Sequence, residues 1–493
     1  MGKRSENSIS RIWLVIRWAV ILPMVLLLVL TLGLAARYLP AKARLDRMKL
    51  DRGGKIFLKF EPVVPDWIRK LVGQERCEPF DRLQEIEFRH VTDENLLKWR
   101  GCFDVESVVF DAYSSEELIT DRSLLLFGEL RSLRSLVIGR GRFTRQGLRA
   151  LANCTQLTNL EIHHAELSPG WCDGIQDIQS LKQFAVGDFG ESTAQSRDIR
   201  ALAAIRHLRM VRLGLHDSTY AQHPLSPLEE SPIGCTWRIK VENLAAELLE
   251  PLAALPDLDT LVVVCDTMSP DALLPLKKSP SLRRLQVYSY DFPPEPQSDP
   301  NLGMLKGCQH VELLEICLRN DVRPVTDNDQ PANHGLEHLA DLPLLTNLVL
   351  HGRLSAKDWE GVARLTNLRG LRLHVWNLDA RASRQHAHLR SLIHLEELAL
   401  PFQGIADNDL NVILSMPKLH WLEFDALVTI APQLQVLAER PDFPAALKPH
   451  LPAALREFEK VAQSGESPDH PTTVTIGWRK RLPSEWMPNP GID

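Results

Sequence analysis

The 493-residue sequence lacks the features that mark several large classes of protein. Its formal net charge is −6 at pH 7, so it has none of the basic excess typical of nucleic-acid-binding proteins. Its eight cysteines contain no Cys-x-x-Cys pair, which leaves zinc ribbons and thioredoxin-type redox centres without support. A hydrophobic content of 44% also excludes a largely disordered chain. We therefore expect a folded protein with no nucleic-acid partner.

Motifs for small ligands are equally scarce. Gly139, Arg140 and Gly141 are too few for a phosphate-binding glycine loop, and they follow a predicted strand instead of opening a helix. Asp327, Asn328 and Asp329 lack the ligand spacing and the closing Glu of a calcium loop. We predict no cofactor, no resident metal ion and no small-molecule substrate, and an enzyme is only a remote alternative.

One long hydrophobic run stands out near the N-terminus. Residues 18–36 carry no charge over nineteen positions, which at ~1.5 Å per residue is about the thickness of a bilayer core. Trp13, Trp18 and Tyr38 lie near its ends, where amphipathic rings favour the membrane interface. The sequence predicts a transmembrane helix over residues 12–36, which would anchor the protein in a membrane by a single pass.

Two questions about this segment stay open. Ala41, Lys42 and Ala43 imitate a signal-peptidase site, but the apolar run is longer than the ~7–15 residues of a signal peptide. Basic residues occur on both sides of the run, so the charge rule does not decide its orientation. Because the leading tail is too short to be a domain, we expect it in the cytoplasm and the rest of the chain outside.

Most of the remaining chain repeats the phrase Leu-x-x-Leu-x-Leu. Several successive starts are 24 residues apart, and a fixed period of this size indicates a solenoid. The alternating end of each phrase predicts a strand, and a second apolar cluster predicts a helical turn opposite it. Counted liberally, fourteen repeats start near residues 83, 105, 133, 157, 181, 208, 236, 258, 282, 311, 345, 368, 395 and 419, and the one near 236 is degenerate.

Capping residues mark where the helical turns should begin. An apolar residue followed by a Ser or Thr precedes five of them, at Thr92, Thr144, Ser168, Ser269 and Ser355. Pro169 and Pro270 would then occupy the first helical position. Three repeats carry long insertions, at 216–234, 290–301 and 319–335, and all begin just after a strand, so they should share one rim of the solenoid.

The segments around the repeats complete the predicted domain order: an N-terminal tail (1–11), the membrane helix (12–36), a basic juxtamembrane segment (37–52), an N-terminal cap (53–82), the solenoid (83–431), and C-terminal capping helices with a tail (432–493). Alternating Ile56, Leu58 and Phe60 predict a strand in the first cap, and residues 62–73 a helix. Alternating Val474 and Ile476 predict a strand in the tail. Such caps cover the exposed ends of a repeat stack.

With the phrase, period and caps together, the chain resembles the leucine-rich repeat family in its helical-backed, cysteine-containing form. The resemblance implies an α/β fold: a right-handed horseshoe with parallel strands on the concave face and helices on the convex face. Cys102, Cys154 and Cys308 share one phase and should be buried. The block from Gly53 to Gly73 is similar to the lead-in of membrane-anchored leucine-rich repeat proteins from planctomycete bacteria, a group without an established activity.

The chain departs from the family pattern at one position. The Asn that usually follows the last strand residue is replaced, for example by Gly141, Ala165 and Gln403. The resemblance therefore supplies no Asn ladder to satisfy the backbone of the turns. It does imply an interaction scaffold whose concave strand face meets the partner.

The strand side chains that flank the core positions are the candidate partner-binding surface. They are Glu87, Arg89, Glu161, His163, Arg212, Lys240, Tyr288, Glu315, His351, Arg372, His374, Trp421 and Glu423. His351 and His374 occupy one phase of adjacent repeats and should lie ~5 Å apart, which makes them the best metal candidates beside His163 and His164. We expect no Cys or carboxylate of that phase in an adjacent repeat, and we therefore interpret them as solvated histidines.

The sequence thus predicts a non-enzymatic, membrane-anchored scaffold that binds a protein through its concave face. A structural envelope protein that acts by self-assembly is the alternative.

Overall fold

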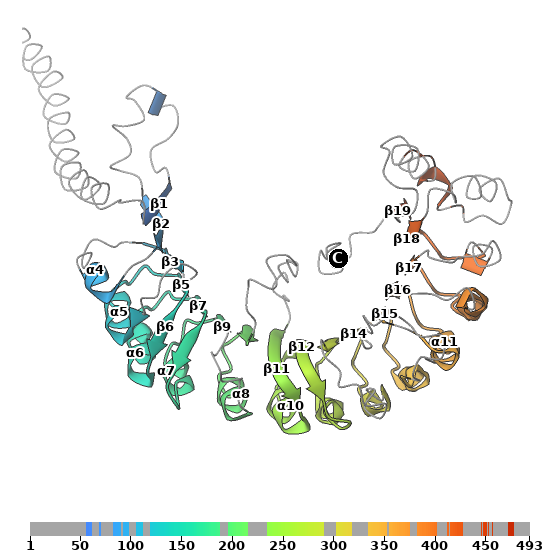
Figure 1. Ribbon diagram of the computed structural model, residues 1–493, viewed down its shortest axis with the longest axis horizontal. Helices are drawn as coiled ribbons and strands as arrows, with labels where there is room; N and C mark the ends of the chain where they lie inside the picture. The colour runs from blue at the N-terminus through green and yellow to red at the C-terminus, as the bar shows by residue number, and fades with distance from the viewer. Residues whose placement is uncertain are drawn as a thin grey trace, which may run out of the picture.

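The computed structural model describes the strand-bearing part of the chain (Figure 1). The described residues are 56–61, 69–70, 82–89, 92–97, 105–111, 119–187, 196–214, 234–289, 302–317, 334–352, 354–374, 382–401, 412–413, 415–426, 472–477 and a few positions between 445 and 456. The predicted membrane helix, juxtamembrane segment, most of the helical caps and most of the three insertions lie outside them. Within the described residues, no helix is long and apolar enough to cross a membrane.

A single curved sheet of sixteen strands runs along the molecule. Fourteen of them pair in parallel and in chain order, at the positions where the repeat phrase predicts strands. They are β2 (Arg82–Arg89), β3 (Ser107–Asp111), β5 (Ser135–Ile138), β7 (Asn159–Ile162), β9 (Gln183–Val186), β10 (Met210–Leu213), β11 (Cys235–Leu244), β12 (Leu258–Met268), β13 (Arg284–Ser289), β14 (Leu313–Cys317), β15 (Asn347–His351), β16 (Gly370–His374), β17 (Glu397–Pro401) and β18 (Trp421–Ala426). The predicted parallel solenoid sheet is confirmed.

Both ends of the sheet change direction. β1 (Ile56–Glu61) pairs antiparallel with β2, and β19 (Thr472–Gly477) pairs antiparallel with β18. These are the two strands that the alternating residues around Leu58 and Val474 predict. An antiparallel strand interrupts the repeating parallel register, so the stack does not present another repeat-like edge at either end.

The convex layer is helical, but only partly α-helical. The α-helices are α4 (Asp93–Leu97), α5 (Asp121–Phe127), α6 (Arg145–Ala150), α7 (Cys172–Gln176), α8 (Ser196–Ala203), α10 (Ala246–Ala253) and α11 (Ala356–Ala363). The 3₁₀ helices are η2 (Leu151–Asn153), η3 (Leu274–Lys278), η4 (Leu302–Leu305), η5 (Leu336–Asp341), η6 (Ala382–Ser391) and η8 (Lys448–His450). A small parallel sheet of β4 (Ile119–Thr120), β6 (Gly141–Phe143) and β8 (Ala165–Leu167) bridges strands and helices near the N-terminal end.

The predicted caps are right in part. Thr144 and Ser355 are N-caps that accept backbone N–H groups of α6 and α11. Ser168 and Ser269 are not, because α7 begins only at Cys172 and η3 only at Leu274. Pro169 and Pro270 therefore do not open helices and instead lie in turns. After Pro169, Gly170 adopts a left-handed φ of 79°, which delays the start of α7.

Hydrogen bonds between successive helix starts link neighbouring repeats near the N-terminal end. The Asp93 carboxylate accepts the backbone N–H of Thr120 at 3.1 Å, and one repeat later Asp121 accepts the N–H of Thr144 at 2.9 Å. The threonine hydroxyls donate to the same carboxylates. These two N-caps are thus each held by an acid one repeat earlier, which stiffens this part of the convex layer.

A continuous apolar core lies between sheet and helices. Wherever their burial is described, the last two apolar positions of a phrase, such as Leu160 and Ile162 of β7, are buried. Cys154 and Cys308 are buried in this core, as predicted, and neither forms a disulfide. Cys102 lies outside the described residues. Burial of one such layer per repeat is what makes stacking favourable.

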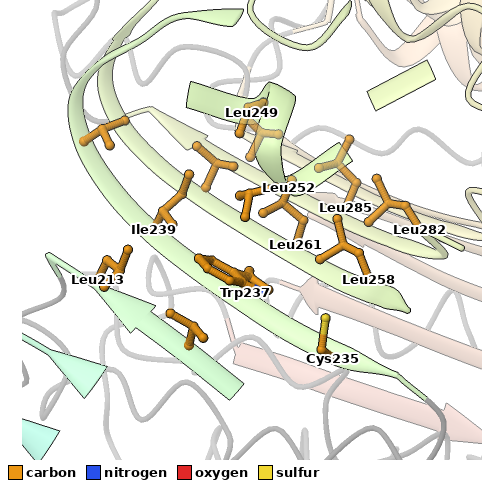
Figure 2. Packing of buried hydrophobic residues seen from close by; sticks show 14 of the residues in the cluster. Leu213, Cys235, Trp237, Ile239, Leu249, Leu252, Leu258, Leu261, Leu282 and Leu285 are labelled. Atoms are coloured by element: carbon orange, nitrogen blue, oxygen red, sulfur yellow. The ribbon is translucent and has the colours of Figure 1, made fainter. Parts of the chain in front are cut away.

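The degenerate repeat near residue 236 keeps its strand. Residues 215–233, between β10 and β11, lie outside the described residues; α10, which follows β11 where the sequence predicts the helix of this repeat, contacts α8. Trp237 of β11 points into the core there, beside Leu213, Leu261 and Leu252 (Figure 2). The indole therefore takes the place that a leucine, its register partner Leu261, holds in β12.

Candidate functional site

The concave side of the sheet carries two rows of outward-facing residues. The central row joins register neighbours from strand to strand: Glu161, Ala185, Arg212, Arg238, Val262, Gln286, Glu315, Val349, Arg372, Ala399 and Glu423. The outer row lies two residues further along each strand and includes Lys240, Val264 and Tyr288, then Cys317, His351 and His374. Twelve of the thirteen residues of the predicted surface lie on strands of the sheet, and His163 directly follows β7.

Glu315 organises the larger polar group on this face, which we call the Glu315 cluster: Gln286, Tyr288, Glu315, His351 and His374. Its carboxylate accepts the Gln286 amide at 2.9 Å on Oε2 and lies 2.9 Å from His351 Nε2 on Oε1. The Tyr288 hydroxyl donates to it as well. Three strands, β13, β14 and β15, therefore converge on one carboxylate whose side chain is only 13% exposed.

The cluster perturbs the titration of its members. Burial acts to raise the pKa of Glu315, but the hydrogen bond and charge of His351 outweigh it and hold the pKa below its usual value. Burial, reinforced by the nearby Glu315 charge, raises the pKa of Tyr288 well above its ordinary value. Burial, with the charges of His351 and Arg372, lowers the pKa of His374 to about 3. At neutral pH the cluster thus holds an ionised carboxylate, a neutral phenol and a neutral imidazole.

The two histidines lie as close as predicted, but they are not the solvated side chains that we expected, because the His351 side chain is only 13% exposed. Their ring centroids are 4.6 Å apart and their planes differ by 11°, so the rings are stacked. Imidazole lone pairs lie in the ring plane, and stacked rings cannot both direct them at an ion between the rings. Cys317 does share their phase as the register partner of His351, contrary to our expectation. Even so, the described residues contain no group of three or more potential ligands placed to hold a metal.

Arg372 and Trp421 form a second contact of the C-terminal half. The guanidinium carbon of Arg372 lies 5.0 Å from the centre of the Trp421 ring system, a cation–π arrangement. Only 3% of Arg372 and 2% of Trp421 is exposed, so the pair is set into the concave face. We predicted residues that a partner would meet directly, whereas this pair instead supports the surface around it.

Glu161 organises a smaller polar group toward the N-terminal end. Its Oε1 accepts Arg212 Nη2 at 3.0 Å and Asn159 Nδ2 at 3.2 Å, and its Oε2 lies 3.8 Å from His163 Nε2. Arg212 in turn is the register neighbour of Arg238. Like charges in direct register repel one another, and the ion pair with Glu161 offsets that repulsion at Arg212. The centre of the concave face thus carries three cationic residues, Arg212, Arg238 and Lys240.

The geometry provides preorganised polar groups. The Glu315 carboxylate is already satisfied by its neighbours, which suits it to fix side-chain positions and leaves little capacity to act as a base.

Gln286, Arg238 and Cys317 are concave-face residues that the sequence prediction missed, although each has the phase of a residue that it included. Counting positions from the core leucines of every repeat, including the degenerate one, would have found them.

Comparison with protein-family models and with curated protein sequences finds no match. Among solved structures, the chain is similar to the TLR13–ssRNA13 complex, with 15% identity and a TM-score of 0.42 over 68% of this chain and 44% of that one. It is also similar to an internalin, InlF of Listeria monocytogenes (15% identity, TM-score 0.33, 68% of this chain and 93% of that one). The plant peptide hormone receptor RGFR1 bound to RGF2 matches at 13% identity and a TM-score of 0.30, over 68% of this chain and 45% of that one. The match thus spans less than half of two of these three proteins.

Proposed function

We propose that the protein is a non-enzymatic scaffold that binds a protein partner through the concave face of its solenoid. The observation that carries this proposal is the fixing of concave side chains by bonds across repeats. Arg212 reaches Glu161 over 51 residues of sequence, and His351 reaches Glu315 over 36. Side chains that are held in place before binding lose less conformational entropy when a partner docks, so the same contacts give higher affinity.

The partially exposed side chains between the two groups supply the contact surface. Lys240 and Met210 are half-buried and lie on β11 and β10, at the centre of the curve. A protein partner with an acidic or mixed surface would meet basic groups here and polar groups on either side. Complementarity of this kind governs partner choice and association rate more than total affinity.

Site-specific photo-crosslinking in the native host tests the proposal. A benzophenone amino acid at Lys240 should crosslink a discrete partner protein, while the same group at Leu125, exposed on the convex helix α5, should not. Equal crosslinking from both positions, or none from Lys240, would contradict a concave-face function. A product containing two copies of this chain would instead support the self-assembling envelope protein.

We further propose that residues 12–36 anchor the protein in a membrane, with the solenoid on the outer side. The support is the uncharged run from Trp18 to Ala36 and its flanking aromatic residues. Externally added protease should degrade the solenoid in intact cells. Protection that is lost only on lysis would place the solenoid in the cytoplasm and restrict its partners accordingly.

A further inference from the structure

Four turns lead from the convex layer into β15, β16, β17 and β18. In each, the N–H of the first leucine of the repeat phrase donates to the carbonyl three residues earlier, as from Leu345 to Leu342 at 3.3 Å. The stretches 375–381 and 402–411, which are not described, follow strands and so join the sheet at the opposite ends of the strands. We call the four turns the entry edge: residues 341–346, 364–369, 390–396 and 415–420, all of which are described.

The entry edge exposes large apolar side chains at two of its four tips. Leu344 is 46% exposed and Ile393 is 52% exposed. The turns before β15 and β17 carry them, two strand intervals or ~10 Å apart. The tips of the equivalent turns before β5, β7 and β9 are polar: Arg131 and Ser132, Thr155 and Gln156, Gln179 and Ser180.

The carboxylates of the entry edge are already paired. Asp341 Oδ2 lies 3.1 Å from Lys306 Nζ, and Glu396 Oε1 lies 3.8 Å from Arg369 Nη1. The four turns contain no other Asp or Glu. Each of these ion pairs is neutral as a unit, so neither adds net charge to the entry edge.

Three further cations lie at the same turns. Arg364, Arg390 and Lys418 are exposed, and none of them pairs with a carboxylate of the described residues. Lys418 Nζ instead lies 2.9 Å from His394 Nδ1. The two exposed apolar side chains are thus set among three cations whose charge no carboxylate of the turns offsets.

We propose that the entry edge rests on a lipid bilayer with anionic headgroups, with Leu344 and Ile393 in the interfacial layer. Surfaces that lie on such bilayers combine apolar side chains, which leave water, with arginines and lysines, which approach the phosphates. A protein partner would need a contiguous packed surface of about 800 Å². Here the polar tip of Thr366 and Asn367 separates the two apolar tips.

The proposed contact is independent of the concave-face function, since none of its residues belongs to either concave row. The proposed anchor over residues 12–36 would hold the solenoid near a bilayer and so favour the contact. The entry edge would then fix how the solenoid is oriented on that surface, which a single anchoring helix at one end of the chain would not do.

A fluorescent amino acid whose emission reports the polarity of its surroundings tests the proposal in the full-length chain. At Ile393 its emission should shift to the blue when vesicles of phosphatidylcholine and phosphatidylglycerol are added, and brominated acyl chains should quench it. At Leu125, 56% exposed on the convex helix α5, it should show neither effect. Insertion of residues 12–36 would bring both positions to the same vesicle, so the comparison holds with or without it. No shift at Ile393, or an equal shift at both positions, would overturn the proposal.

Charge variants test the role of the cations. Arg390→Gln and Arg364→Gln should each weaken the contact about fivefold, the contribution of one basic residue near an anionic surface, read as quenching against the phosphatidylglycerol fraction. Arg122→Gln, at an exposed arginine of α5, is the matched control and should leave quenching unchanged. Quenching that neither variant at the entry edge reduces, or that is as strong in pure phosphatidylcholine, would refute an anionic surface. A blue shift that needs no vesicles and grows with protein concentration would indicate contact between copies and equally refute the proposal.

Discussion

The imidazole of His374 stacks on that of His351, with ring centroids 4.6 Å apart, and its Nε2 is buried without a hydrogen-bond partner among the described residues. The neighbouring ring of His351 contacts the Glu315 carboxylate through Nε2, so one ring of the stacked pair has a polar partner there and the other does not. Because burial keeps the His374 ring neutral, the folded protein should lose stability as the pH falls.

Replacing His374 should reduce the loss of folding stability at acid pH. The folded-state pKa of about 3 lies below the ordinary 6.5, so between these values the unfolded chain binds a proton that the folded chain does not. Stability is therefore full above pH 6.5 and falls as pH decreases toward 3. Between pH 6.5 and 5 this group contributes a loss of about 2 kcal/mol.

Denaturant unfolding of the His374→Gln variant at several pH values measures the effect. The variant should lose less stability than the unmodified protein between pH 6.5 and 5, by up to that amount. His310→Gln, at an exposed histidine, is the matched control and should keep the original profile. A profile unchanged by His374→Gln would mean that this imidazole titrates normally.

Neutralising Glu315 should destabilise the C-terminal half of the solenoid. Glu315→Gln removes the charge that His351, Gln286 and Tyr288 surround, at an expected cost of about 1–3 kcal/mol. Glu312→Gln is the control three residues away, where the carboxylate is 46% exposed and 3.7 Å from Arg283. That change should cost less than about 1 kcal/mol. Thermal unfolding distinguishes the two, and similar losses would show that the Glu315 cluster has no special stability.

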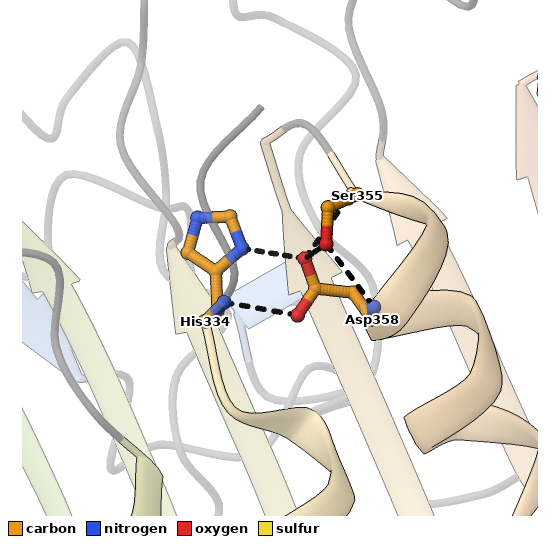
Figure 3. A network of polar contacts seen from close by, with 3 residues as sticks. All are labelled: His334, Ser355 and Asp358. Atoms are coloured by element: carbon orange, nitrogen blue, oxygen red, sulfur yellow. Dashed lines mark hydrogen bonds and ion pairs between the residues drawn. The ribbon is translucent and has the colours of Figure 1, made fainter. Parts of the chain in front are cut away.

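The carboxylate of Asp358 holds the start of α11 to the preceding repeat. It accepts the Ser355 hydroxyl and backbone N–H within the capping box, and it accepts the backbone N–H of His334 at 3.0 Å (Figure 3). His334 Nδ1 lies 2.9 Å from its second oxygen. Burial acts to raise the pKa of Asp358, yet these bonds, those of His334 foremost, hold it below its usual value. Asp358 is therefore ionised, buried and fully engaged.

Asp358→Ala should cost about 2–4 kcal/mol, since it removes an N-cap partner and leaves buried donors unsatisfied. Asp271→Ala is a suitable comparison, because Asp271 also accepts a serine hydroxyl, from Ser269 at 2.8 Å, but on the surface. Its expected cost is below about 1 kcal/mol. Urea midpoints of the two variants provide the measurement, and a mild effect of Asp358→Ala would argue against this role.

The buried cysteines should be unreactive in the folded protein. Burial raises the pKa of Cys154 to about 12 and that of Cys308 to about 11, so little thiolate exists at pH 8. Iodoacetamide followed by peptide mass spectrometry should show both unmodified under native conditions and both alkylated in urea. Alkylation of either at the same rate in both conditions would indicate local opening of its repeat.

The repeat phrase was sufficient to place the strands because each one needs only alternation and a buried leucine. It was not sufficient for the polar contacts. Glu315 bonds to His351, yet its register neighbour is Val349, so the contact runs diagonally across the sheet and depends on side-chain rotamers that no spacing rule specifies.

The helical layer was harder to predict for a different reason. Ser168 and Ser269 have the residue type of a cap, but the chain turns once more before α7 and η3 begin, and the short connections of the C-terminal half close as 3₁₀ turns. Local propensities are too weak to distinguish these outcomes, since the packing of the neighbouring repeat decides them.

The mixture of helix types has a consequence for shape. A solenoid bends because its convex elements need more room side by side than strands spaced ~4.8 Å apart. The α-helices concentrate before η3 and the tighter 3₁₀ turns after it, and the step from α8 to α10 spans two strand intervals without a described helix between them. The radius of the arc should therefore be smaller over β2–β9 than over β13–β17, which would give the concave face two regions of different curvature.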